Sequence, residues 1–426
     1  MVFHPRERPR QWEARRPLVA GMPRREFIRL SLMGAATAGL GPVLLAACGG
    51  DDDDGGSASG VRLSRPDNPV TLPTFDDVEP IADGLPIESG TLKVFNYQEY
   101  ISPDVLAAFE DEFGVTVEVT TFNSMDEAIA KLSSGDTQFD VYFPTADVIG
   151  KAAAGKLLQP LNKSYIPNVT NVWESLQDPF YDKGGVYSVP YTLFSTGIGY
   201  RVDAVARTPA MFDNPYDIFW DSSNSGQVYV LEDDREVFGM ALLRSGQTDV
   251  NTEDAELIEA ALAEVAQLND LVNVKVGAEA YTVLPEKRTW VHQAWSGDVV
   301  NAQYYLPEGE TIDNIGYWYP VDGGGMIGSD TIAVMRGAER PVLAHTFINY
   351  LLDATHSIEN YSWLGYQPPQ TGFDPDLAVA DEYVPTHLAS AIIRPQDFEG
   401  GHQLLQLSLA GEKIWDDAWS KFIAGA

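Results

Sequence analysis

The feature that most limits how this chain can fold is a regular alternation of strand-like and helix-like segments that begins at residue 91. Residues 91–96 alternate between apolar and polar side chains, which predicts a strand. Ser102 followed by proline then marks a helix start, and Gly114 marks its end. The series predicts strands over 91–96, 115–122 and 139–144, and helices over 103–113, after Ser124 and over 145–154. This order implies an α/β fold with a mostly parallel sheet and helices on both faces.

The same rhythm starts again in the second part of the chain. It predicts strands over 228–231, 290–295 and 331–335, and helices over 234–244 and 252–268. A chain of 426 residues is too long for one ordinary hydrophobic core. Two α/β units therefore predict two lobes with a cleft between them. In open α/β sheets, ligands bind beyond the carboxyl ends of the strands.

The residues that lie near the predicted strand ends are mostly acidic or aromatic. They are Tyr97, Glu99, Tyr100, Thr145, Asp147, Asp233, Asp234, Glu236, Trp295, Asp330 and Tyr366. Carboxylates pair with ammonium groups, and aromatic faces hold both a cation and its methylene chain. The set therefore favours a site for an organic cation.

Each of these residues also has a structural interpretation when it is taken alone. Asp233 and Glu236 have the spacing of a helix capping box. Asp147 suits the first turn of the helix that follows it. Further structural interpretations are a core aromatic for Trp295, a surface acid for Glu99 and a turn residue for Tyr366. Only their convergence on predicted strand ends favours the functional interpretation.

The charge balance narrows the class of partner. The chain has 28 Lys and Arg against 62 Asp and Glu, a net charge of −34. Such a charge repels nucleic acid and anionic lipid, and it also has a simpler explanation as a solvated acidic surface. The single cysteine excludes a disulfide framework and a multi-cysteine metal site. We therefore expect no nucleic-acid partner, no metal and no cofactor.

An enzyme is the alternative from a different class. The six histidines are scattered, and the chain contains neither a His-Glu-x-x-His nor a Gly-x-Ser-x-Gly motif. Paired carboxylates leave an exported hydrolase acting on glycosides as the enzymatic alternative.

Residues 1–47 have the features of an export signal. Arg24 and Arg25 form a twin-arginine pair, and an apolar run rich in Gly and Ala follows over 30–47. The run is too weakly apolar for a membrane-spanning helix but suits a signal peptide. It leads into Leu-Ala-Ala-Cys, ending at Cys48, which resembles a bacterial lipobox, where the cysteine is lipidated and becomes the first mature residue. The alternative is a buried free cysteine after a chance apolar run.

The segments on either side of this signal contain few sequence signals of a folded domain. Residues 1–21 resemble neither a signal nor a domain, so Met22 is a second candidate start. Residues 48–89 are expected to form an acidic flexible tether, because 49–60 contain four consecutive Asp with Gly and Ser. We therefore expect an exported lipoprotein of the cell envelope, in the periplasm or on the outer face of the cytoplasmic membrane. Its folded body is expected to begin near Gly90.

From about residue 91 to 425 the chain resembles the bacterial spermidine/putrescine-binding proteins, the periplasmic receptors of polyamine ABC importers. The resemblance is collinear and is most specific where the sequence reads Asn-Tyr-Gln-Glu-Tyr and Asp-Asp-Arg-Glu-Val-Phe. The segments that carry it are 94–100, 139–141, 187–191, 197–199, 233–238, 295–297 and 365–368.

The resemblance implies a two-lobed periplasmic-binding-protein fold, type II-like, with a ligand cleft between the lobes. One lobe would comprise 91–200 and 329–373, and the other 201–328 and 374–426. Glu99 would face one end of the polyamine, Asp233 and Glu236 the other end, and Asp330 a central amine. Tyr97, Tyr100, Trp295 and Tyr366 would wall the methylene chain, and Thr145 would supply a hydroxyl contact.

Three departures from the family pattern leave the length and charge of the ligand open. Asp147 stands where the family usually has an aromatic residue, and it joins the candidate ligand-binding residues. Gly328 stands where the family has a wall aromatic. The Asp-Asp-Arg run is one residue shorter than usual, so Asp233 and Asp234 compete for one role.

For function, the resemblance implies that the chain is the substrate-binding subunit of an ABC importer. Its expected partners are a polyamine and the permease subunits in the membrane, with the membrane itself contacted only through the lipid anchor, and it is expected to be a monomer. A receptor of the same fold for another organic cation or small solute, such as an opine, an aminophosphonate, a sugar or ferric ion, is the main alternative. Phosphonate would need basic residues at the strand ends, where this chain has acids.

Overall fold

The computed structural model describes residues 63–135, 138–277, 280–320, 324–381 and 383–425. These residues belong to one compact unit. The expected signal peptide and the lipidation site at Cys48 lie outside the described residues. None of the described helices is both long enough and apolar enough to cross a membrane.

The first predicted strand–helix series is confirmed. Strand β1 (Thr91–Tyr97) pairs in parallel with β2 (Thr116–Phe122) and with β3 (Val141–Tyr142), which is shorter than predicted. The helices between and after them are α2 (Pro103–Phe113), α3 (Met125–Ser134) and α4 (Ile149–Ala154). Gly114 ends α2 with a φ of 64°, as its lack of a side chain permits. The helix predicted over 145–154 is divided into a 3₁₀ turn, Ala146–Val148, and α4.

The second series is also present. Strand β6 (Val228–Leu231) pairs in parallel with β7 (Lys275–Gly277) and β8 (Val291–Trp295). Helices α6 (Asp234–Arg244) and α7 (Ala255–Val272) follow β6, and α14 (Leu409–Gly425) packs against both of them. β7 and α14 were not predicted from the sequence.

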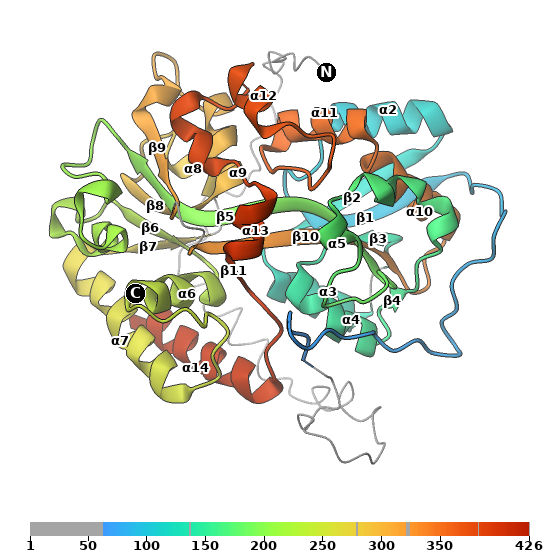
Figure 1. The fold of residues 1–426 in the computed structure, drawn as a ribbon, viewed down its shortest axis with the longest axis horizontal. Helices are drawn as coiled ribbons and strands as arrows, with labels where there is room; N and C mark the ends of the chain where they lie inside the picture. The colour runs from blue at the N-terminus through green and yellow to red at the C-terminus, as the bar shows by residue number, and fades with distance from the viewer. Residues whose placement is uncertain (1–62, 136–137, 278–279, 321–323, 382, 426) are drawn as a thin grey trace. The chain divides into compact units, whose positions relative to one another are not determined.

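Two long antiparallel strands join the two parts of the sheet, so the expectation of a mostly parallel sheet is wrong and the sheet is mixed. Strand β5 (Ser188–Arg201) pairs with β10 (Met326–Met335) up to Thr196 and with β8 from Thr196 onward. The strand order is β2-β1-β3-β10-β5-β8-β6-β7, and β5 and β10 run through the middle of it (Figure 1). β5 was not predicted, because almost every residue in it is buried and the alternation that marks a half-exposed strand is absent.

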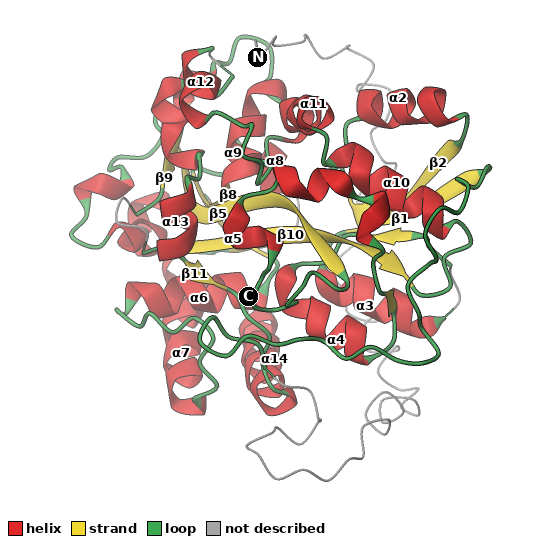
Figure 2. Cartoon of the chain, turned by 45° about the vertical axis from the view of Figure 1, so that its right-hand side comes forward, coloured by secondary structure: helices red, strands yellow, loops and turns green. Residues whose placement is uncertain are grey.

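Helices cover both faces of this sheet (Figure 2). The remaining described elements are β4 (Leu158–Gln159), β9 (Ile315–Trp318), β11 (His402–Gln403), α5 (Glu174–Gln177), α8 (Ala280–Val283), α9 (Ser296–Asn301), α10 (Pro341–Leu351), α11 (Ala354–Leu364), α12 (Pro375–Ala380) and α13 (Pro395–Gly400). Two apolar clusters pack around β1 to β3 and two around β6 to β9. Each part of the sheet is therefore packed with apolar side chains on both faces.

Residues 63–89 form no helix or strand, yet they pack on the body. Val70 and Leu72 are buried in the apolar cluster that also contains Phe95. The Glu88 carboxylate accepts hydrogen bonds from the backbone N–H groups of Val342 (3.2 Å) and Leu343 (2.7 Å), which stabilises the start of α10. This part of the expected tether therefore belongs to the packed body, which begins well before Gly90.

Candidate functional site

One face of β5 and β10 carries the first buried carboxyl group. In this antiparallel pair Asp330 lies opposite Thr192. Asp330 is 5% exposed, and its Oδ2 accepts a hydrogen bond from the Tyr100 hydroxyl, which also lies 2.6 Å from the Thr192 Oγ1. Its other oxygen, Oδ1, is buried without a hydrogen-bond partner among the described residues. Burial is the main reason that the pKa of Asp330 is raised to about 7.

A second buried carboxyl group, Glu236, lies at the start of α6. Its Oε1 accepts hydrogen bonds from the Trp295 indole N–H (2.9 Å) and the Thr196 hydroxyl (3.0 Å). Its Oε2 is buried and has no partner among the described residues. Burial, followed by the nearby charge of Asp233, raises the pKa of Glu236 to about 8.

The capping interpretation of this turn is confirmed for only one of its two residues. Asp233 caps α6, since its Oδ1 accepts a hydrogen bond from the Glu236 backbone N–H (3.0 Å). The Glu236 side chain, however, turns to Trp295 and Thr196, as described above. Asp233 thus fixes the turn from which Glu236 projects into the interior.

A third carboxyl group, Asp298, was not singled out from the sequence. It lies in the first turn of α9, directly after the Trp295-Ser-Gly segment, and it is 7% exposed. Its Oδ1 accepts a hydrogen bond from the Tyr366 hydroxyl (2.8 Å), whereas its Oδ2 is buried without a partner among the described residues. Burial raises the pKa of Asp298 to about 7. Its position three residues after Trp295, which was predicted to lie near a strand end, was the available signal.

Aromatic rings connect these acids. The ring centroid of Tyr100 lies 5.5 Å from that of Tyr97 and 5.2 Å from that of Tyr366. Burial is the main reason that the pKa of Tyr97 is raised, and the charges of Asp330 and Asp233 add to it. The predicted residues Tyr97, Tyr100, Asp233 and Asp330 are therefore close enough to interact, although they come from both parts of the sheet.

Thr145 and Asp147 lie beside Asp330. Thr145 forms an isolated antiparallel bridge with Asp330, and its hydroxyl is buried without a partner among the described residues. Asp147 is half-buried, and its charge adds to the rise in the pKa of Asp330. The residue that stands where an aromatic was expected therefore adds negative charge to the same cluster.

Glu99 does not join this cluster. Its side chain is exposed, and its backbone has a φ of 56°, in the left-handed region. Tyr97 and Tyr100 on either side of it are half-buried and buried. The left-handed turn orients the intervening side chain toward solvent, a local geometry that the sequence pattern did not reveal.

The chemistry of the cluster suits a cation. Arg235 follows Asp234 and precedes Glu236 in the sequence, but its guanidinium contacts other groups. It donates hydrogen bonds to the Leu405 carbonyl and the Asn251 Oδ1 and lies 4.6 Å from the Trp415 ring centroid. Within the described ranges, no three His, Cys, Asp or Glu side chains are grouped so that they could hold a metal ion. Buried carboxyls with free oxygens among aromatic rings can accept the N–H donors of an organic ammonium.

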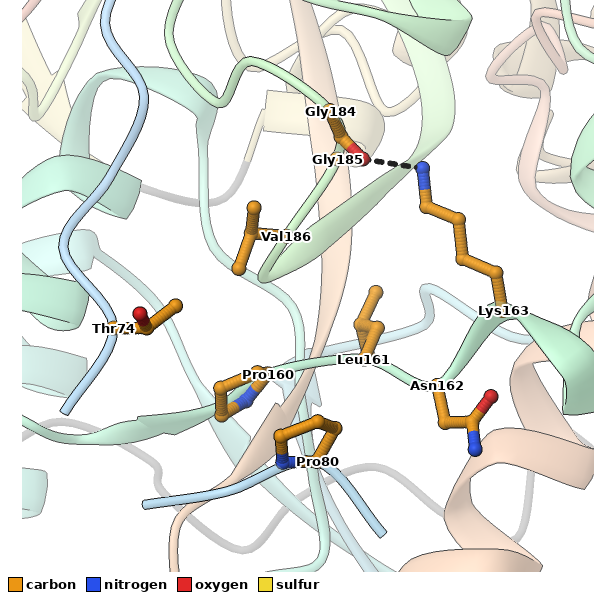
Figure 3. Close-up of a pocket in the computed structure, with 9 residues that line it drawn as sticks. All are labelled: Thr74, Pro80, Pro160, Leu161, Asn162, Lys163, Gly184, Gly185 and Val186. Carbon is orange, nitrogen blue, oxygen red and sulfur yellow. Dashed lines mark hydrogen bonds between the residues drawn. The ribbon is translucent and has the colours of Figure 1, made fainter. Parts of the chain in front are cut away.

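A cavity of about 490 Å³ lies elsewhere, where residues 74–80 pass over the body (Figure 3). Its single charged lining residue is Lys163, whose ammonium donates a hydrogen bond to the Gly184 carbonyl (2.5 Å). Because no carboxylate lines it, this cavity lacks the groups that a cation requires.

The sequence of this chain matches the model of a known protein family. The family model for bacterial extracellular solute-binding proteins matches residues 104–386. A putrescine/cadaverine-binding protein of Pseudomonas aeruginosa is 27% identical over 339 residues, covering 76% of this chain and 92% of that protein. A spermidine/putrescine-binding periplasmic protein of Escherichia coli is 28% identical over 283 residues, covering 66% and 78% respectively.

Solved structures share the fold. A putative spermidine/putrescine ABC transporter protein from Listeria monocytogenes superimposes with a TM-score of 0.64 at 24% identity, covering 79% of this chain and 99% of that one. A periplasmic binding protein of Agrobacterium tumefaciens, solved in complex with agropinic acid, has a TM-score of 0.57 at 20% identity, covering 79% of this chain and 98% of that one. At these identities the likeness supports the predicted periplasmic-binding-protein fold.

Proposed function

This chain belongs to the bacterial extracellular solute-binding proteins, and on that premise we propose that it captures a polyamine, such as putrescine or spermidine, for an ABC importer. It is thus a solute receptor and not an enzyme. The observation that carries the proposal is the set of three buried carboxyls, Glu236, Asp298 and Asp330, each with one oxygen that has no partner among the described residues. The names of the curated relatives support the same ligand class.

The free carboxyl oxygens would receive the ammonium groups. Removing an ammonium from water costs several kcal/mol, so each buried amine needs a carboxylate in good geometry. Micromolar affinity requires about 8 kcal/mol net. A few charge-assisted hydrogen bonds and aromatic contacts, at roughly 1–2 kcal/mol each beyond desolvation, are sufficient.

The candidate residues can be assigned to different parts of the ligand. In this proposal Glu236 and Asp233 attract one end, and Asp330 with Asp147 attracts another amine. Rings and hydroxyls along the chain would come from Tyr97, Tyr100, Trp295, Tyr366 and Thr145. Glu99 would act at the rim, because its side chain is exposed.

Lobe closure is the accompanying conformational proposal. The two lobes, 91–200 with 329–373 and 201–328 with 374–426, would close with β5 and β10 as the joint. The closed monomer is then the form that the permease subunits read.

A ligand panel tests the function. We expect putrescine or spermidine at a hundred times its dissociation constant to raise the melting temperature by about 5 °C. An opine, a sugar, an aminophosphonate and ferric ion should leave it unchanged, and mass spectrometry should return the bound amine unaltered. Stabilisation by one of those solutes and by no polyamine would contradict the proposed ligand class.

The membrane anchor is a separate proposal, and it rests on the sequence of residues 22–48. We propose export through the twin-arginine signal and lipidation of Cys48. In membrane fractions of a bacterial host, the Cys48→Ser variant should move to the soluble fraction, whereas the wild type should stay with the membrane. Equal membrane association of the two proteins would contradict the anchor.

A further inference from the structure

A ring that the sequence did not single out lies on β5 between the residues that contact two of the buried acids, Asp330 of β10 and Glu236 of α6. Successive side chains of a strand point to opposite faces, so Thr192, Phe194 and Thr196 of β5 share one face. Thr192 belongs to the hydrogen-bonded group around Asp330, and Thr196 donates a hydrogen bond to Glu236. Phe194 therefore lies on the same face, midway between the two carboxyls.

The neighbouring strand leaves room for this ring. Gly328 of β10 lies directly opposite Phe194 (Figure 2 shows the two strands side by side). A Cβ atom on Gly328 would overlap the Phe194 ring, so the ring extends across the glycine. The absent side chain at Gly328 is thus replaced by an aromatic surface from the adjacent strand.

The ring is also partly open. Phe194 is half-buried, whereas its neighbours Leu193 and Ser195 are fully buried. Its centroid lies 6.5 Å from that of Trp295, edge to face, and the Trp295 indole N–H holds Glu236. The ring therefore continues the aromatic surface that begins beside the Glu236 carboxyl.

We propose that Phe194 is the floor of the ligand site and contacts the chain of the polyamine between the amines held by Glu236 and Asp330. This inference rests on the proposed function. From Thr192 to Thr196 the strand advances about 13 Å, so a ligand that reaches both carboxyls crosses the ring on its way. An aromatic face attracts both a cation and the methylene groups beside it.

The test compares two variants by calorimetry with spermidine. Phe194→Ala should weaken binding roughly tenfold. The double variant Phe194→Ala with Gly328→Phe returns a ring to the same face from the opposite strand and should recover affinity to within about threefold of wild type. Phe113→Ala is the control, because that half-buried ring packs on Phe109 and Tyr350, away from the acids, and its loss should leave spermidine affinity unchanged.

The outcomes separate this inference from the function on which it rests. Wild-type protein that binds no polyamine overturns both. Wild-type binding with an unchanged affinity in Phe194→Ala overturns the role of the ring alone. If Phe194→Ala weakens binding and the double variant does not restore it, the loss comes from strand packing. That result also overturns the proposed role of the ring.

Discussion

Replacing Glu236 with glutamine should weaken spermidine binding at least about thirtyfold, which corresponds to the lower end of the 2–5 kcal/mol that an unpaired buried charge costs. The amide keeps an oxygen that can accept hydrogen bonds from Trp295 and Thr196, so the protein should stay folded. What it loses is the negative charge, and its amide nitrogen repels an ammonium.

Glu232→Gln is the matched control for this variant. Glu232 lies four residues earlier, in the same turn after β6, but its side chain is exposed. Calorimetry should give wild-type affinity for Glu232→Gln and a melting temperature no lower than that of wild type for both ligand-free variants. Equal binding by Glu236→Gln and wild type would remove Glu236 from the site.

Lowering the pH from 8.5 to 5.5 should weaken polyamine binding by at least about a hundredfold. Burial raises the pKa of Glu236 to about 8 and those of Asp298 and Asp330 to about 7 in the ligand-free protein. The primary amines of the ligand resemble the Lys side chain and stay protonated throughout this range. Below pH 7 the ligand must therefore expel protons from the carboxyls, and affinity falls as the pH falls.

Calorimetry in buffers of different ionisation enthalpy measures this proton release directly. We expect protons to be released on binding at pH 7, with Asp147 and Asp233 adding negative charge and Arg235 adding positive charge near the same acids. An affinity that stays constant between pH 5.5 and 8.5, with no proton release, would contradict the assignment of these acids to the ligand.

Glu236, Asp298 and Asp330 affect the stability of the ligand-free protein in the opposite direction: affinity rises with pH, whereas stability falls. Their pKa values are raised above the unfolded values, so between about pH 4 and pH 8 the folded state binds more protons than the unfolded state. Their contribution to the free energy of unfolding therefore decreases as the pH rises through this range. Bound polyamine should reverse that trend, because it pairs with the ionised carboxyls.

Local signals predicted the fold where one face of an element is exposed. The Ser102–Gly114 boundaries gave α2, and Ser124 caps α3 by accepting a hydrogen bond from the Glu127 N–H (3.2 Å). The two strands that join the parts of the sheet were harder. β5 was missed and only the second half of β10 was predicted, because burial on both faces removes the alternating pattern.

The site was predictable in its chemistry more than in its geometry. The structure brings Tyr97, Tyr100 and Asp330 together, but Asp330 lies in the middle of β10 and not at a strand end. Glu236 is held separately by Trp295 and Thr196. The exposure of Glu99 depends on one left-handed residue, which sequence pattern does not encode. Asp298 and Phe194 were missed because their importance arises from contacts across strands and helices: Asp298 with Tyr366, and Phe194 with Gly328.

The most direct measurement is a crystal structure of the protein grown with spermidine. We predict density for one extended amine across β5 and β10, with its nitrogens within hydrogen-bond distance of Glu236 Oε2 and Asp330 Oδ1. Spermidine bound elsewhere on the protein would contradict the proposed site. So would a structure without spermidine between Glu236 and Asp330 in which both carboxyls keep only their present hydrogen bonds.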